Sequence, residues 1–144
     1  MPIERLGRTT PAISLEWKNV MGSALLISVV DDDEGIRISL DGLLRSAGHR
    51  AQTYACAEDA LADTEVAQSA CVITDLQMQK LNGLEFARQL RAINPEIPIL
   101  LITAYPTAEA EHRARETGVL FLSKPFEANE LLKLVDEMIG TGAR

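Results

Sequence analysis

Four short apolar runs, each followed by polar residues, constrain the fold of this chain more than any other feature. The runs are rich in valine, isoleucine and leucine and cover residues 24–30, 70–74, 97–102 and 119–122. Helix-length amphipathic segments separate such runs in α/β proteins, where the runs form buried parallel strands. The polar residues that follow them are Asp31 and Asp32, Asp75, Thr103 and, one residue later, Lys124. Because ligands bind at the carboxyl ends of the strands in open α/β sheets, we expect these side chains at one edge.

The segments between the runs predict helices with one apolar face. Ile36, Leu40, Leu43, Leu44 and Ala47 recur at the spacing of an amphipathic helix, and the following Gly48 is typical of a helix end. We also expect a strand over residues 49–54 and helices over 58–66, from 84 to 93, over 107–117 and from 127 onward. Thr107 is a good N-cap for the helix over 107–117.

Five strands that alternate with five helices predict a doubly wound parallel α/β sheet of the flavodoxin-like class. Right-handed crossovers cover both faces of such a sheet only if the chain reverses direction once. The strand order 2-1-3-4-5 places this reversal between the first and third strands, where the binding crevice lies. Asp31, Asp32 and Asp75 then face one another there. We expect this domain over residues 24–140, after a poorly ordered extension (1–23) and before a C-terminal tail (141–144).

Charge and composition argue against several classes of partner. The 144 residues carry a net charge of −7 and have a pI near 4.8, which disfavours direct binding to nucleic acid. No apolar stretch approaches the roughly 20 residues that span a membrane. Cys56 and Cys71 lack metal-ligand spacing and are expected to be reduced thiols of a cytoplasmic protein. We expect His49 and His112 at the surface, because neither has a partner at metal-ligand spacing.

The motifs at the strand ends match those of a known family. Residues 29–34 read Val-Val-Asp-Asp-Asp-Glu, and residues 72–78 read Val-Ile-Thr-Asp-Leu-Gln-Met, with Asn82 and Gly83 further along the same loop. Residues 102–104 read Ile-Thr-Ala, and residues 123–126 read Ser-Lys-Pro-Phe. Each motif alone is weak, but the four in this order are specific. Over residues 24–140 the chain resembles the receiver domain of bacterial two-component response regulators.

This resemblance implies a site that accepts a phosphoryl group with the help of a divalent cation. Asp75 would be the phosphoacceptor and would also bind the metal. Asp32 would bind the metal directly, Asp31 through water, and Gln77 through its backbone carbonyl. The implied ion is Mg²⁺, with Mn²⁺ as the alternative, because Mg²⁺ prefers oxygen ligands and offsets the repulsion among carboxylates.

Further residues are implied to bind the phosphoryl group or to respond to it. Thr103 would donate a hydrogen bond to the phosphoryl oxygens, and Lys124 would place its ammonium against them. Phe121 occupies the position of the switch aromatic. Gln77 and Tyr105 would flank the path of water to the phosphoryl group, and Tyr105 would shield the group from that water. Ala104 would leave room for a phosphohistidine at the access to the phosphoryl group.

Two residues of these motifs leave alternatives open. Gln79 stands where the family usually has proline, so we expect the loop after Asp75 to be more mobile. Asp33 fits the acidic motif and equally well the N-cap of the helix that follows it.

The resemblance implies a phosphorelay switch rather than an enzyme. A sensor histidine kinase or a histidine phosphotransfer protein would donate the phosphoryl group. The face made by helix 107–117, strand 119–122 and the helix from 127 would then bind a downstream protein. The chain would act as a monomer or as a dimer that forms on phosphorylation, without contact to nucleic acid or membrane.

Two other functions remain open from the sequence. A truncated transcriptional response regulator that lacks its DNA-binding domain would carry the same motifs. A phosphatase of the haloacid-dehalogenase type would use Asp31 as its nucleophile and Asp33 as a second catalytic carboxylate. That second alternative would leave Asp75 without a role.

Overall fold

A parallel sheet of five strands forms the centre of the molecule, as the alternation of strands and helices predicts. The computed structural model describes residues 25–143, so the predicted extension over 1–23 lies outside the described residues. The strands are β1 (Leu26–Val30), β2 (Arg50–Tyr54), β3 (Cys71–Asp75), β4 (Ile99–Thr103) and β5 (Leu120–Ser123). They pair in parallel in the order β2-β1-β3-β4-β5, which confirms the predicted topology.

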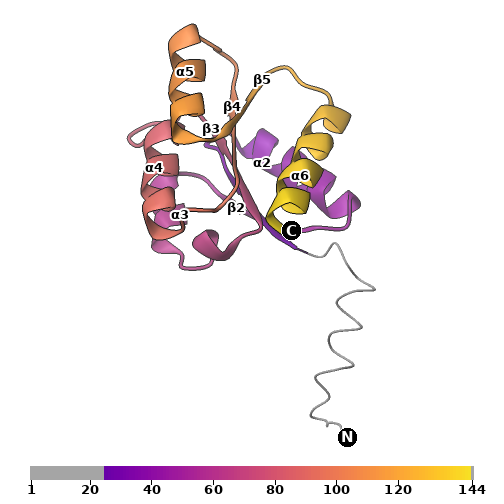
Figure 1. Ribbon diagram of the computed structural model, residues 1–144. Coiled ribbons are helices and arrows are strands. Elements are labelled where there is room, and N and C mark those ends of the chain that lie inside the picture. The colour runs from indigo at the N-terminus through magenta and orange to yellow at the C-terminus, as the bar shows by residue number, and fades with distance from the viewer. Residues whose placement is uncertain (1–24, 144) are drawn as a thin grey trace, which may run out of the picture.

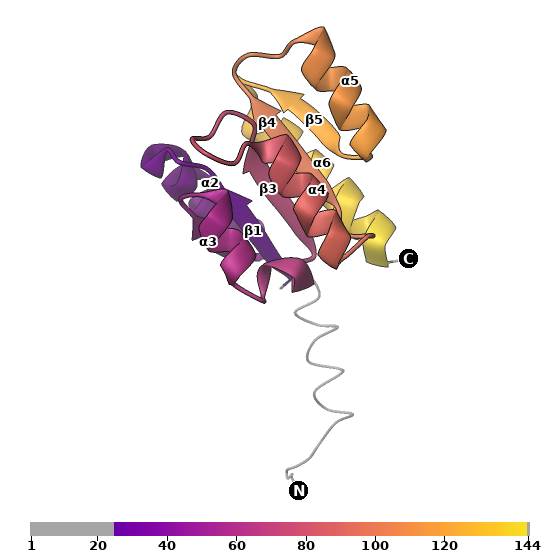
Figure 2. The same cartoon turned by 90° about the vertical axis from the view of Figure 1, so that its left-hand side faces the viewer.

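Helices cover both faces of this sheet. They are α2 (Glu34–Ser46), α3 (Ala57–Ala62), α4 (Gly83–Ile93), α5 (Ala108–Thr117) and α6 (Ala128–Ala143), with a short 3₁₀ helix η1 (Val66–Gln68). The first face carries α3, α4 and α5, and the opposite face carries α2 and α6 (Figure 1). Figure 2 shows α3, α4 and α5 side by side in front of the sheet. Among the residues that the structure describes, no helix has the length and apolar character needed to cross a membrane.

The sheet separates two apolar clusters, one under each layer of helices. Ile99 and Leu101 of β4 belong to the cluster under α3, α4 and α5, whereas Leu100 and Ile102 belong to the cluster under α2 and α6. This division follows from the strand geometry, because successive side chains point to opposite faces. All four residues are almost fully buried, which explains why the sequence of β4 is a continuous apolar run.

The second helix differs from its prediction, because α3 ends at Ala62 and a 3₁₀ turn follows it. The backbone of Asp63 is extended, and its side chain accepts hydrogen bonds from the Tyr54 hydroxyl (2.8 Å) and the Glu65 amide (2.9 Å). These bonds hold Asp63 outside the helix. Val66, the predicted helix end, is instead buried at the start of η1.

The ends of the later helices largely follow their sequence signals. The Thr107 side chain accepts a hydrogen bond from the Ala110 amide (3.0 Å), so Thr107 is the N-cap of α5 as predicted. Gly118 ends this helix at a φ of 78°, a left-handed conformation that favours glycine. The last helix, α6, continues to Ala143, beyond the predicted domain end at residue 140.

Candidate functional site

The register of the strands brings the predicted polar residues to one edge of the sheet. Val30 pairs with Thr74, so the residues that follow them, Asp31 just after β1 and Asp75 at the end of β3, lie at the same level. Thr103 ends β4 and pairs with Ser123, directly before Lys124. The Lys124 amide also donates a hydrogen bond to the Thr103 carbonyl (2.7 Å), which fixes the backbone next to the lysine. The shared edge therefore follows from backbone pairing alone.

Three carboxylates gather at this edge. Asp31, Asp32 and Asp75 can each present an oxygen such that all three atoms lie within 4.8 Å of one another. Asp31 is 3% exposed and Asp75 is 7% exposed, whereas Asp32 is open to solvent. Two buried carboxylates so close together repel each other, because the protein interior screens charge less than water does.

Hydrogen bonds hold Asp31 in place. Its Oδ1 accepts from the Asp33 amide (2.9 Å), and its backbone carbonyl accepts from Arg37 Nη1 (2.7 Å). The Asp33 side chain accepts from the Ile36 amide (3.2 Å) and so acts as the N-cap of α2. Of the two alternatives for Asp33, the structure thus supports the helix cap.

Asp75 is less well satisfied than Asp31. Among the described residues, its Oδ1 is a buried side-chain oxygen without a hydrogen-bond partner. Lys124 Nζ lies 3.5 Å from this oxygen and 3.7 Å from Asp31 Oδ2. Both distances are long for a charge-assisted hydrogen bond, so the ammonium acts mainly through its charge. An oxygen in this condition is suited to a further positive or electrophilic group.

The electrostatics of the two buried carboxylates reflect this crowding. Burial raises the pKa of Asp31 above its usual value, although the bond from the Asp33 amide and the Lys124 charge act against the shift. Burial also raises the pKa of Asp75, the negative charge of Asp31 adds to this effect, and Lys124 opposes it. One lysine therefore does not neutralise the cluster.

The donor set fits a hard divalent cation. All of the candidate ligand atoms are oxygens, one carboxylate is solvent-facing, and the Asp75 Oδ1 has no hydrogen-bond partner among residues 25–143. Mg²⁺ binds through one or two carboxylates and keeps several water molecules, which such a half-open cluster allows. The ion would supply positive charge that offsets the carboxylate repulsion.

Thr103 is engaged in a way that the sequence did not predict. This residue is fully buried, and its hydroxyl donates a short hydrogen bond (2.6 Å) to the side-chain oxygen of Gln77. The Tyr105 amide donates to the same hydroxyl oxygen (2.9 Å). We expected Gln77 to act through its backbone carbonyl, and nothing in its spacing from Thr103 pointed to a side-chain bond.

The loop after β3 approaches the site closely at Gly83. The Gly83 amide donates to the Leu76 carbonyl (3.0 Å). A Cβ atom at Gly83 would clash with the Asp75 carbonyl oxygen and with the Leu101 side chain. The motif Asn82-Gly83 thus has a steric reason, since the start of α4 presses against the backbone of Asp75. The Asn82 side chain accepts from the Glu85 amide (2.9 Å) and serves as the N-cap of α4.

The remaining predicted residues lie around this centre. Phe121 is half-buried and packs on the cluster under α3, α4 and α5. Gln79 and Ala104 are exposed, and the Tyr105 side chain is 71% exposed. Shielding of a phosphoryl group by Tyr105 therefore stays a prediction.

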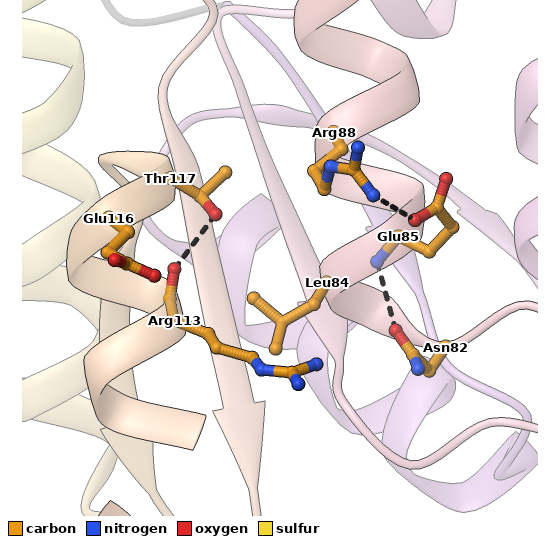
Figure 3. A pocket seen from close by; sticks show the side chains of 7 residues that line it. All are labelled: Asn82, Leu84, Glu85, Arg88, Arg113, Glu116 and Thr117. Atoms are coloured by element: carbon orange, nitrogen blue, oxygen red, sulfur yellow. Dashed lines mark hydrogen bonds and ion pairs between the residues drawn. The ribbon is translucent and has the colours of Figure 1, made fainter. Parts of the chain in front are cut away.

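A hollow of about 320 Å³ lies between α4 and α5, and none of the three clustered aspartates lines it (Figure 3). Its charged side chains pair within their own helices. Arg88 Nη1 lies 2.6 Å from Glu85 Oε1, and Arg113 Nη2 lies 3.4 Å from Glu109 Oε2. The hollow thus separates two helices and does not gather convergent chemistry.

One of the two histidine predictions was wrong. His112 is exposed, as expected, but the His49 side chain is only 6% exposed. His49 directly precedes β2, and its amide donates to the Leu44 carbonyl (3.0 Å), which turns the residue inward. Its Nε2 lies 4.0 Å from Asp136 Oδ1 of α6. Cys56 and Cys71 are free thiols, as expected, and Cys71 is buried in the sheet.

Comparison with known proteins agrees with the geometry. The family model described as "Response regulator receiver domain" matches residues 27–136. Transcriptional regulatory protein TdiR of Thauera aromatica is 33% identical over 116 residues, which cover 80% of this chain and 51% of the relative. The chain spans about half the length of several such curated relatives.

Solved structures show the same arrangement of the fold. The chemotaxis protein CheY4 of Vibrio cholerae has a TM-score of 0.74 and 28% identity, over 81% of this chain and 99% of that chain. The BeF3-activated DrrB receiver domain has a TM-score of 0.75 and 28% identity, over 81% of this chain and 97% of that chain.

Proposed function

This chain belongs to the response regulator receiver domain family, and we propose that Asp75 accepts a phosphoryl group from a phosphohistidine. The donor is a sensor histidine kinase or a histidine phosphotransfer protein of the cytoplasm. The observation that carries the proposal is the state of Asp75. Within the described part of the chain, its Oδ1 is buried without a hydrogen-bond partner, and it lies 3.5 Å from the Lys124 ammonium beside two further carboxylates.

The transfer exchanges one bond to phosphorus for another. A carboxylate oxygen of Asp75 forms a bond to phosphorus while the phosphorus–nitrogen bond of the donor breaks. The electron pair of that bond stays on the ring nitrogen, and the ring, protonated at its other nitrogen, leaves as neutral imidazole. Catalysis of this kind consists mainly of positioning and charge neutralisation, which the cluster provides.

The surrounding residues divide these tasks. Asp32 and Asp75 would hold the cation directly, Asp31 would hold it through water, and Gln77 would contribute its backbone carbonyl. Lys124 places its charge against one phosphoryl oxygen, and the Thr103 hydroxyl donates to another. Mg²⁺ is the favoured ion, and Mn²⁺ satisfies the same oxygen ligands.

Thr103 lies between the phosphoacceptor site and α5, and this position would transmit the phosphorylation of Asp75 to the partner-binding surface. When its hydroxyl turns to the phosphoryl group, the loop from β4 to α5 moves with it, and Phe121 repacks against the cluster under α5. The face made of α5, β5 and α6 then binds a downstream protein or a second copy of the chain.

Particular observations support one of the two alternative functions and argue against the other. A receiver that forms one part of a transcriptional regulator is supported by relatives such as TdiR, of which this chain spans about half. A phosphatase with Asp31 as nucleophile is disfavoured, because the Asp33 amide already occupies Asp31 Oδ1 and the Asp33 carboxylate caps α2.

The test is phosphorylation by acetyl phosphate with Mg²⁺, followed by mass spectrometry of the intact protein. We expect one added phosphoryl group, lost in Asp75→Asn and in the presence of excess chelator. The matched control is Asp33→Asn, because asparagine also caps helices and should leave labelling intact. Equal labelling of Asp75→Asn would contradict the proposal, and loss of labelling in Asp31→Asn alone would favour the phosphatase.

A further inference from the structure

The Gln77 side chain occupies the hydrogen-bonding capacity of the Thr103 hydroxyl. A threonine hydroxyl has one proton to donate and two lone pairs that accept. In the structure the proton goes to Gln77 Oε1 at 2.6 Å, and the Tyr105 amide uses one lone pair at 2.9 Å. The hydroxyl therefore cannot donate to a phosphoryl oxygen until it releases Gln77.

The burial of Thr103 increases the contribution of this hydrogen bond to the stability of the resting orientation. Thr103 is fully buried, and a buried donor that lacks an acceptor loses its hydration without compensation. Gln77, in contrast, is exposed, so its amide exchanges the threonine for water at small cost. The bond thus stabilises one orientation of Thr103 and is easy to break from the side of Gln77.

We propose that the Gln77 side chain is a latch that holds Thr103 in its resting orientation and competes with the phosphoryl group for the same hydroxyl proton. The proposal rests on the proposed function of Asp75 and adds a positioning residue to it. Gln77 would act at two points, since its backbone carbonyl is a proposed ligand of the cation and its side chain restrains Thr103. Phosphorylation would have to overcome the latch before the loop to α5 responds.

If Gln77 restrains Thr103 in this way, removal of the Gln77 acceptor should lower the free energy needed to turn Thr103 toward a phosphoryl group. A neutral hydrogen bond has a net value that corresponds to a factor of about two to ten in an equilibrium. Gln77→Leu keeps the size of the side chain and removes the acceptor. We expect Gln77→Leu to bind beryllofluoride, a phosphoryl analogue, about two- to tenfold more tightly than the native protein in the presence of Mg²⁺.

The experiment is calorimetric titration of beryllofluoride into the whole chain with saturating Mg²⁺. Gln77→Asn serves as a second latch variant, because its amide is one methylene shorter and does not reach Thr103. Gln79→Leu is the matched control, since it removes an exposed glutamine from the same loop. We expect both Gln77 variants to tighten binding and Gln79→Leu to match the native protein.

A double-mutant cycle separates a latch from a general effect on the loop. In a Thr103→Val background the hydroxyl is absent, so Gln77→Leu should no longer change the affinity. The chemical shift of the Thr103 methyl group supplies a second readout. In the Gln77→Leu variant without Mg²⁺ and beryllofluoride, this chemical shift should move toward its value in the beryllofluoride complex. A merely structural role of Gln77 would not produce that change.

The outcomes distinguish the latch from the function on which it rests. If the native protein binds no beryllofluoride with Mg²⁺, the proposed role of Asp75 fails. If the native protein binds but both Gln77 variants bind equally or more weakly, the latch is wrong and the role of Asp75 stands. An undiminished effect of Gln77→Leu in the Thr103→Val background would also overturn the latch.

Discussion

Neighbouring helices α4 and α5 cover the same face of the sheet but are held to it by different forces. Phe86, Ala87 and Leu90 of α4 are fully buried in the cluster beneath them. From α5, only the two alanines Ala110 and Ala114 are buried among the described side chains of that helix. The apolar area that α5 removes from water is therefore much smaller, and so is the hydrophobic contribution that fixes it.

Polar contacts compensate for this at one end of α5. The Arg91 side chain, on α4, donates to the carbonyls of Thr117 and Gly118 (both 3.1 Å) and to that of Ile97 (2.8 Å). The bonds to Thr117 and Gly118 tie the C-terminal end of α5 to α4. The N-terminal end of α5 follows the loop from Thr103. Hydrogen bonds from Arg91 therefore hold the last turn of α5, whereas little buried apolar surface holds its first turn, which follows the loop from Thr103.

The largest expected effect tests the burial of α4. Phe86→Ala should lower the free energy of unfolding by about 3–5 kcal/mol, because it removes a fully buried ring and leaves a cavity. The matched change in α5 is Ala114→Gly, which should cost only about 1 kcal/mol through helix propensity. Urea unfolding monitored by circular dichroism measures both. Similar losses in the two variants would refute the contrast between the helices.

The features that the sequence predicts best are those with strong local periodicity. The apolar runs located four of the five strands, and β2 was expected separately over residues 49–54. The connection rules gave the strand order, because burial and handedness act through local pattern. The positions of Asp31, Asp75 and Lys124 in the sequence predicted that their side chains lie at one edge of the sheet, because parallel strands align their carboxyl ends. Features that depend on individual tertiary contacts were missed. The bond from Thr103 to Gln77, the inward turn of His49 and the early end of α3 belong to this class.

The second prediction removes the anchor of α5. Arg91→Met keeps the apolar stem of the side chain but loses three hydrogen bonds to backbone carbonyls, which should cost about 2 kcal/mol. Hydrogen exchange should accelerate in the last turn of α5. The control is Arg88→Met, which breaks an exposed ion pair with Glu85 and should cost less than about 1 kcal/mol. Unchanged exchange in α5 of Arg91→Met would show that other contacts hold this end.

The third prediction compares equivalent caps. Asn82 caps α4 and Thr107 caps α5, each by accepting one amide hydrogen bond. Alanine at either position should cost about 1 kcal/mol. For Asn82→Ala the loss should appear in global unfolding, because burial couples α4 to the core. For Thr107→Ala it should appear mainly as faster hydrogen exchange in the first turns of α5, through local opening. The comparison would be wrong if Asn82→Ala only accelerated local hydrogen exchange and Thr107→Ala lowered the free energy of global unfolding.

The smallest effect that we expect is the response to activation, and it tests whether the loosely held helix is the one that moves. Saturation with Mg²⁺ and beryllofluoride should change hydrogen exchange a few-fold at the N-terminal end of α5 and in β5. The reason is that Thr103 turns toward the phosphoryl analogue and the loop between Thr103 and Thr107 moves with it. Few buried side chains of α5 oppose this movement. The amides of α4 around Phe86 and Leu90 should keep their exchange rates, because the fully buried side chains of that helix hold it to the sheet. Asp75→Asn, treated in the same way, supplies the baseline. A response confined to α2, or one of equal size in α4 and α5, would mean that weak burial does not determine which helix responds.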